Sequence, residues 1–287
     1  MNACLIICSK VRSAACLTAL VVLAAAPCLA APSGKYLHFD GTSDLATIPD
    51  ANHLDLAQVT LKTWVSFDRF ASGTGYHPTD SQFLVAKGSD LAPTYWLAQT
   101  NQTDQGMNSL TVATGVGGPG ALGYHAMDLG QWYHVAGTYD GTTHRLFFNG
   151  QEIASLSTYP GRSLVNSLPL ILGYCRPSWE YYLSGSLDSV AVWNHARSAG
   201  QIQADMGGLT GGEAGLVGYW PFEEALDSQV ILDHSIYGNH GVLGRTLAVE
   251  GSDPTRVPEP ATLAILVCGG LVLIRHRRAK RTGNFWS

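Results

Sequence analysis

Apolar and polar residues alternate over short stretches through most of this chain, and Gly, Pro, Asn or Asp interrupts each stretch. Alternation with a period of two is the pattern of β-strands, in which successive side chains point to opposite faces. Many short strands with few helices predict an all-β sandwich of two antiparallel sheets. The predicted strands are residues 36–40, 59–67, 82–86, 95–99, 109–114, 132–139, 144–148, 151–156, 170–173, 186–193 and 216–221.

Two local motifs make the prediction more specific. Asn149-Gly150 lies between two apolar stretches, which predicts a two-residue hairpin, because such a turn needs positive φ at both positions. The one clear helix candidate begins after Ser198 as N-cap, runs to about Met206 and is ended by Gly207-Gly208.

The amino-terminal end has the layout of a secretory signal peptide, predicted to cover residues 1–31. Two cations precede an apolar stretch at 14–26, and small residues follow it. Cleavage is expected after Ala30 or Ala31. A lipoprotein site at Cys28 is the alternative, but the proline directly before this cysteine fits such a site poorly.

The carboxyl-terminal end resembles the PEP-CTERM sorting signal of Gram-negative bacteria. It has the tripeptide Pro258, Glu259 and Pro260, an apolar run over 261–274 and then five cations. In that family a membrane protease, exosortase, processes the signal and passes the protein to the surface or the matrix. A spanning helix needs roughly 20 apolar residues, so this run predicts a short anchor in the inner membrane with a cytoplasmic basic tail. A permanent single-pass anchor without processing is the alternative.

The expected organisation is therefore a signal peptide at 1–31, one domain at 32–243, a flexible stalk at 244–256, the sorting signal at 257–281 and a tail at 282–287. The stalk is predicted from its Gly, Ser, Asp, Thr and Pro content, which gives no apolar periodicity.

The charge and cysteine content of the exported body exclude some classes of function. Residues 32–256 hold 10 Lys and Arg against 21 Asp and Glu, which argues against a nucleic-acid partner. Cys175 is the only cysteine of that body, so an intramolecular disulfide has no second thiol, and a Cys-His zinc cluster is unsupported. We expect Cys175 to be a partly buried small apolar residue.

Several blocks of the body together resemble the laminin-G-like jelly roll of the concanavalin A-like lectin fold. One late segment departs from the order found in many relatives, where it precedes the opening strand. Because the termini of a sandwich lie close together, either order supplies the same edge strand. The resembling blocks are 36–44, 59–65, 132–141, 146–150 and 185–198, and the late segment comprises 215–222 and 233–241.

The sequence carries no recognisable catalytic motif, and we expect no enzymatic activity. Related folds include β-glucanases, but glycoside cleavage needs two suitably spaced carboxylates. The pattern Glu-x-Asp-x-x-Glu does not occur, and the adjacent Glu223 and Glu224 are interpreted as turn residues. A glycoside hydrolase is therefore kept only as a remote alternative.

The resemblance implies calcium as a structural ligand, since jelly rolls of this type often hold one. The aspartates to consider are Asp40 in the opening block and Asp188 in the last strand. Calcium takes oxygen ligands from carboxylates and loop carbonyls. The alternative is that Asp40 only caps its Asp-Gly turn and that Asp188 only bonds to backbone.

For sugar binding the informative residues are aromatic side chains on loops, because the face of a pyranose stacks on an exposed ring. The best candidates are Arg176, Trp179, Tyr181 and Tyr182, in a connection broken by proline. The loop segment 76–78 and the strand pair Tyr95-Trp96 are weaker candidates. The tryptophans expected in packing instead are Trp64, Trp132, Trp193 and Trp220.

Two functions from different classes remain. One is a surface or matrix protein that binds carbohydrate or mediates adhesion, with a polysaccharide as partner. The other is a structural or protein-interaction domain without sugar specificity. The fold alone does not decide between them.

Overall fold

Two antiparallel sheets pack face to face, as the strand pattern predicts. The computed structural model describes residues 33–71, 81–88, 93–104, 107–115, 120–158, 163–175 and 181–258. Both predicted end signals, apart from Val257 and Pro258, lie outside these residues. Among the described residues no helix is long and apolar enough to cross a bilayer.

The first sheet, called sheet A, is built around the long strands β3 and β14. Its order is β10 (Gln151–Ser157), β9 (Thr143–Phe148), β8 (Trp132–Tyr139), β3 (Val59–Phe67), β14 (Ser184–Trp193), β1 (Lys35–Asp40) and β18 (Thr255–Pro258), and β15 (Leu216–Trp220) also pairs with β14.

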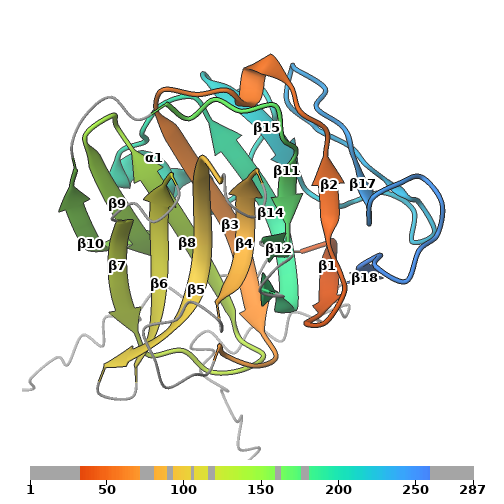
Figure 1. The fold of residues 1–287 in the computed structure, drawn as a ribbon, viewed down its shortest axis with the longest axis horizontal. Coiled ribbons are helices and arrows are strands. Elements are labelled where there is room, and N and C mark those ends of the chain that lie inside the picture. Colours follow the sequence, from red (N-terminus) through yellow and green to blue (C-terminus); the bar gives the residue numbers. More distant parts are fainter. Residues whose placement is uncertain are drawn as a thin grey trace, which may run out of the picture. The chain divides into compact units, whose positions relative to one another are not determined.

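The second sheet, called sheet B, faces the viewer in Figure 1, with β7, β6, β5, β4, β11 and β2 side by side from left to right. Its order is β16 (Val230–Ile231), β17 (Gly241–Leu243), β2 (Ala46–Ile48), β11 (Leu170–Leu172), β4 (Gln82–Lys87), β5 (Tyr95–Asp104), β6 (Met107–Thr114) and β7 (Gly120–His125). A separate hairpin pairs β12 (Tyr174–Cys175) with β13 (Tyr181–Tyr182).

The main core lies between the two sheets. Alternate residues of each strand point into it, as Leu61 and Val65 do from β3 and Leu97 and Val112 do from β5 and β6. All four are fully buried. The alternation in the sequence is therefore the alternation between the core and the outer face of each sheet.

The predicted hairpin and helix are both confirmed. Asn149 and Gly150 join β9 to β10 with φ of 47° and 76°. Helix α1 (Ala199–Asp205) has Ser198 as N-cap, and Ser198 and Gln201 form a reciprocal capping box. A one-turn 3-10 helix, η1 (Asn52–Leu54), follows β2.

The late segment supplies strands beside the opening block, as its sequence resemblance implies. Strands β1 and β15 pair with the same side of β14, on either side of a bulge between Asp188 and Ala191. Ser189 adopts a φ of 52° within this bulge. In the loop before β17, Asp233 accepts backbone hydrogen bonds from Tyr219 and Asn239, which holds the loop against β15.

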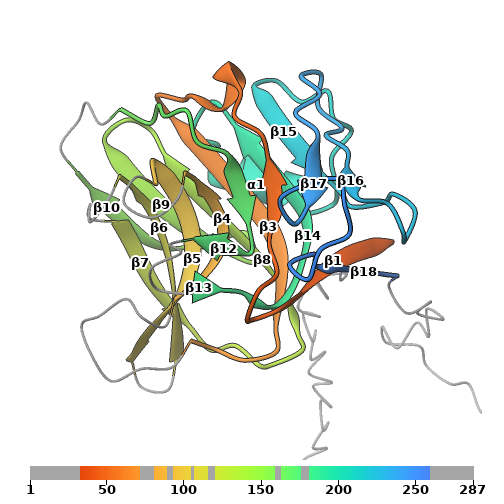
Figure 2. The same cartoon turned by 45° about the vertical axis from the view of Figure 1, so that its right-hand side comes forward.

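The segment 244–256, predicted to be a flexible stalk, instead belongs to the folded domain. Strand β18 pairs with β1 over four residues, from Thr255 opposite His38 to Pro258 opposite Lys35, and Figure 2 shows the two strands side by side. Because β18 pairs with a strand more than 200 residues earlier, local composition does not reveal it. The tripeptide predicted as a sorting motif therefore begins within sheet A, at Pro258.

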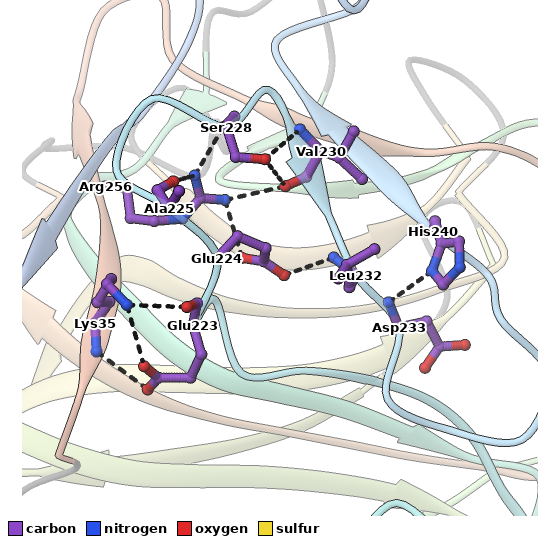
Figure 3. Close-up of polar contacts among 10 residues, drawn as sticks. All are labelled: Lys35, Glu223, Glu224, Ala225, Ser228, Val230, Leu232, Asp233, His240 and Arg256. Carbon is purple, nitrogen blue, oxygen red and sulfur yellow. Dashed lines mark hydrogen bonds and ion pairs between the residues drawn. The ribbon is translucent and has the colours of Figure 1, made fainter.

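A buried ion pair attaches β18 to the preceding loops (Figure 3). The Arg256 side chain is fully buried, and its Nη2 lies 3.0 Å from Glu224 Oε2. Its guanidinium also donates to the carbonyls of Ala225, Ser228 and Val230. Burial lowers the pKa of Arg256 from its usual value, and the Glu224 carboxylate opposes that shift. One cation thus joins β18 to three residues of the loop between β15 and β16 and to the first residue of β16.

Candidate functional site

The predicted aromatic residues cluster on the outer face of sheet B, although not all of them are described. Arg176 and Trp179 lie outside the described residues, as does the segment 76–78. Tyr181 is 1% exposed and stacks on Phe83 at 5.9 Å between ring centroids. Tyr181 therefore packs the hairpin of β12 and β13 onto sheet B, with little of its ring left for a ligand.

Tyr174 and Tyr182, the other two tyrosines of this hairpin, also pack on the outer face of sheet B. Tyr182 is half-buried and stacks on Tyr174, with 4.4 Å between ring centroids. Both rings contact the apolar group of Leu45 and Ile171. Cys175 of the same hairpin is fully buried against sheet B, more deeply than its expected partial burial. The hairpin therefore covers the part of the outer face over β4 and β11.

Beyond the hairpin, Trp96 of β5 is the largest partly exposed side chain among the described residues of the outer face. In the sheet register it lies between Ala86 of β4 and Ala113 of β6. One side of its ring packs on Phe83, at 5.2 Å between centroids. The ring is thus fixed at one edge and flanked by small side chains, which is an arrangement suited to stacking.

The outer face continues across β6 and β7. Thr111 is opposite Ala98 on one side and opposite Leu122 on the other. Leu122 and Tyr124 of β7 are half-buried, so both expose part of their surface. Trp96 on one side and the two β7 residues on the other therefore border a strip of smaller side chains.

The two aspartates proposed for calcium do not share a site. Asp40 is opposite Ser184 of β14, four residues before Asp188, so the two lie roughly 13 Å apart along the sheet. Asp188 is 2% exposed and accepts from the Ser189 hydroxyl. The described residues contain no group of three His, Cys, Asp or Glu side chains arranged for a metal ion.

Asp40 caps its own turn. Its carboxylate accepts hydrogen bonds from the backbone N–H groups of Thr42, Ser43 and Asp44 and from two hydroxyls. Burial raises the pKa of Asp40, but these hydrogen bonds outweigh it and hold the pKa well below its usual value. The neighbouring Asp44 shows the reverse, since burial and the nearby charge of Asp40 raise its pKa to about 6.

The outer face of sheet A differs from that of sheet B because helix α1 and its flanking loops cover its centre. Lys62 of β3 is buried there and donates to the Asp205 carbonyl at 2.6 Å. Arg197 forms a two-pronged ion pair with the Asp205 carboxylate, at 2.6 and 2.8 Å, and lies over the Trp193 ring. Burial lowers the pKa of Lys62 to about 8. The charged side chains on this face therefore form intramolecular contacts between sheet A, helix α1 and the loop before it.

The adjacent glutamates Glu223 and Glu224 are each bonded to a different part of the fold. Glu223 accepts from the Lys35 backbone and lies 3.7 Å from its ammonium group. Glu224 is bound to Arg256 and accepts from the Leu232 N–H. Both carboxylates therefore have structural partners, which agrees with their interpretation as turn residues.

The two sheets, their register and the aromatic outer face define a lectin-type jelly roll. A family model described as "Concanavalin A-like lectin/glucanases superfamily" matches residues 40–203, which is more than half of the chain. The chain belongs to this superfamily. No curated protein matches it in sequence.

Solved structures with the same architecture come from several organisms. A Bacteroides ovatus protein to which carbohydrate binding is attributed aligns with a TM-score of 0.59 and 19% identity, over 80% of this chain and 61% of that protein. This chain therefore spans about three fifths of that protein. The heptameric SAP-like pentraxin of Limulus polyphemus aligns with a TM-score of 0.49 and 15% identity, over 60% of this chain and 82% of the pentraxin.

A third structure is the CBM40 module of the Ruminococcus gnavus IT-sialidase, bound to α2,3-sialyllactose. It aligns with a TM-score of 0.44 and 16% identity, over 62% of this chain and 98% of the module. The likeness to the Bacteroides ovatus protein, at 19% identity, describes the fold alone, and ligands have to be argued from the residues of this chain.

Sequence reasoning placed Trp96 correctly in a strand but ranked it below the segment 176–182. Whether an outward strand residue is exposed depends on what covers the sheet at that point. The hairpin of β12 and β13 covers Phe83 and leaves part of Trp96 open, and no local pattern in the sequence encodes that difference.

Proposed function

We propose that this chain is an exported, non-enzymatic protein that binds carbohydrate with the outer face of sheet B. The observation that carries the proposal is the partly exposed side chain of Trp96, held at one edge by Phe83 and bordered by small residues. A pyranose presents an apolar C–H face that packs on such a ring, while its hydroxyls bond to polar groups beside it. Tyr124 of β7 carries a partly exposed hydroxyl-bearing ring on the same face, and Thr111 of β6, 6% exposed, lies between the strands of the two rings.

A binding role rather than a catalytic one is supported by the use of the carboxylates. Glycoside cleavage needs an acid and a second carboxylate on either side of the bond. The outward residues of β4 to β7 whose side chains are described include no Asp or Glu. The adjacent pair Glu223 and Glu224 is held by Lys35 and Arg256.

The proposed location is the cell surface or the extracellular matrix. It rests on the sequence of the two ends, which resemble a secretory signal peptide and a PEP-CTERM sorting signal. In this proposal the apolar run at 261–274 anchors the chain transiently in the inner membrane until an exosortase-type protease processes it. Comparing the mass of the protein in cells with and without that protease tests the proposal, because an unchanged mass would leave a permanent anchor.

Carbohydrate binding is tested with the full chain, purified in mild detergent, on a broad glycan array in calcium and again after chelation. Trp96→Ala is expected to weaken binding about tenfold, the equivalent of 1.4 kcal/mol. Trp132→Ala is the matched control, since Trp132 is also half-buried but lies on sheet A against Tyr36. Equal binding by the Trp96 variant and the wild type would refute this site.

A protein-interaction role is the second candidate, favoured by a specific feature of the carboxyl-terminal third. Exposed large apolar side chains are concentrated there, with Ile236 and Val249 each 82% exposed. Exposed apolar surface is common at interaction sites. If no glycan binds to the folded chain, while Ile236→Ser and Val249→Ser abolish retention in isolated matrix, this second function replaces the first.

A further inference from the structure

The outer face of sheet B is uncharged at every outward position whose side chain is described from β4 to β7. The register places Phe83, Ala98, Thr111 and Leu122 in one row across the four strands. The row through Trp96 contains only alanine and glycine besides it. The side chains are therefore apolar or carry a hydroxyl, over a face about four strands wide.

The eight described cations of the domain interact with groups away from this face, whereas Arg162 and Arg176 lie outside the described residues. Polyanions such as uronic acid polymers are normally bound by Arg or Lys, which offer charged donors to carboxylates. Among the described residues, seven of the eight Lys and Arg side chains donate to a carboxylate or a carbonyl, and Arg245 interacts with Glu250. Of these cations, none projects from the outer face of β4 to β7.

The net negative charge of the body also disfavours acidic ligands. The body at 32–256 has 10 basic against 21 acidic residues, so it repels polyanions at long range. A neutral polymer is unaffected by this field. The uncharged outer face of sheet B and the net negative charge of residues 32–256 therefore both disfavour acidic polysaccharides.

We propose that the outer face of sheet B binds a neutral polysaccharide and excludes acidic ones. This inference rests on the proposed function of carbohydrate binding. The affinity comes from stacking on Trp96 and from apolar contact with Leu122, together with hydrogen bonds to sugar hydroxyls. None of these interactions is an ion pair, so binding to the neutral polymer is expected to change less than about twofold with ionic strength.

The test compares retardation of the full chain by neutral polymers, laminarin and galactomannan, with retardation by the acidic polymers alginate and hyaluronan. Each measurement is made at low and at raised ionic strength. The expected result is retardation by a neutral polymer that is insensitive to salt, and none by the acidic ones. Retardation of the wild type by the acidic polymers alone would overturn the neutral-ligand inference but leave carbohydrate binding intact.

A charge variant makes the test independent of the identity of the natural polymer. Leu122→Lys places a cation on β7 at the border of the face and is expected to create salt-sensitive binding to alginate. The matched control is Leu156→Lys, because Leu156 is 38% exposed on β10, an edge strand of sheet A. Equal alginate binding by both variants would overturn the role of this face. Failure of the folded wild type to bind any polymer would overturn the proposed function itself.

Discussion

Replacing Arg256 by methionine is expected to destabilise the whole domain. The guanidinium is fully buried and forms the ion pair with Glu224, whose side chain is only 7% exposed. Methionine has nearly the same length but leaves the Glu224 carboxylate buried without its cation. Breaking a buried pair in this way costs about 3–5 kcal/mol.

The hydrogen bonds from Arg256 to the three carbonyls contribute less to the free energy of unfolding than their number suggests. The Ala225 carbonyl also accepts from the Ser228 N–H, and the Val230 carbonyl also accepts from the Ser228 hydroxyl. The Ser228 carbonyl relies most on Arg256, at 2.7 Å, and losing it adds about 1 kcal/mol. The expected loss is therefore about 4–6 kcal/mol, which for a domain of this size lowers the melting temperature by roughly 10 °C or more.

The assay is thermal unfolding of the full chain followed by near-UV circular dichroism. Lys35→Met is the control, because Lys35 makes a comparable but exposed pair with Glu223, with 28% and 41% of the side chains exposed, and such pairs contribute at most about 1 kcal/mol. Adding Glu224→Gln to the Arg256 variant removes the stranded charge but keeps an acceptor for the Leu232 N–H, so it is expected to recover part of the loss. A melting temperature of Arg256→Met equal to that of Lys35→Met would refute the structural role of β18.

Two further predictions concern pH and calcium. The pKa of Lys62 is lowered to about 8 in the fold against 10.5 in the unfolded chain, so the unfolded state binds more protons between these values and stability rises with pH across that window. The rise, at most about 3 kcal/mol, is expected to be absent in Lys62→Met, and parallel pH profiles of both proteins would contradict it. If Asp40 binds a structural calcium ion, the melting temperature is expected to be higher in calcium than in chelator, and Asp40→Asn is expected to remove this difference. Equal melting temperatures of the wild type in both conditions would end the calcium hypothesis.

The long strands could be predicted from the sequence because their pattern is local. Strands β3 and β8 have the predicted bounds, since nine and eight residues are long enough to show alternation and flanking turns. The strands β16, β17 and β18 were not predicted. With two to four residues each, they carry no periodicity, and their pairing depends on partners distant in the sequence.

The candidate site was predictable only in part, for a related reason. An aromatic surface near 174–182 followed from composition, and Tyr181 and Tyr182 do lie on the outer face of sheet B. Which ring stays open was not predictable, because it depends on how a two-residue hairpin strand packs across β4. Trp96 keeps part of its surface exposed for this reason, whereas Tyr181 does not.

The two outer faces of the sandwich show how an acidic protein can still have an uncharged face. Lys62, Arg197 and Asp205 lie between sheet A and helix α1, where they hold the helix on the sheet. Arg256 and Glu224 do the same for β18 at its edge. On sheet B the described residues of the β12 and β13 hairpin pack through apolar and aromatic side chains instead. The charged side chains that close the fold thus leave the described part of one face without charge, and the proposed ligand of that face would be held by stacking and by its hydroxyls.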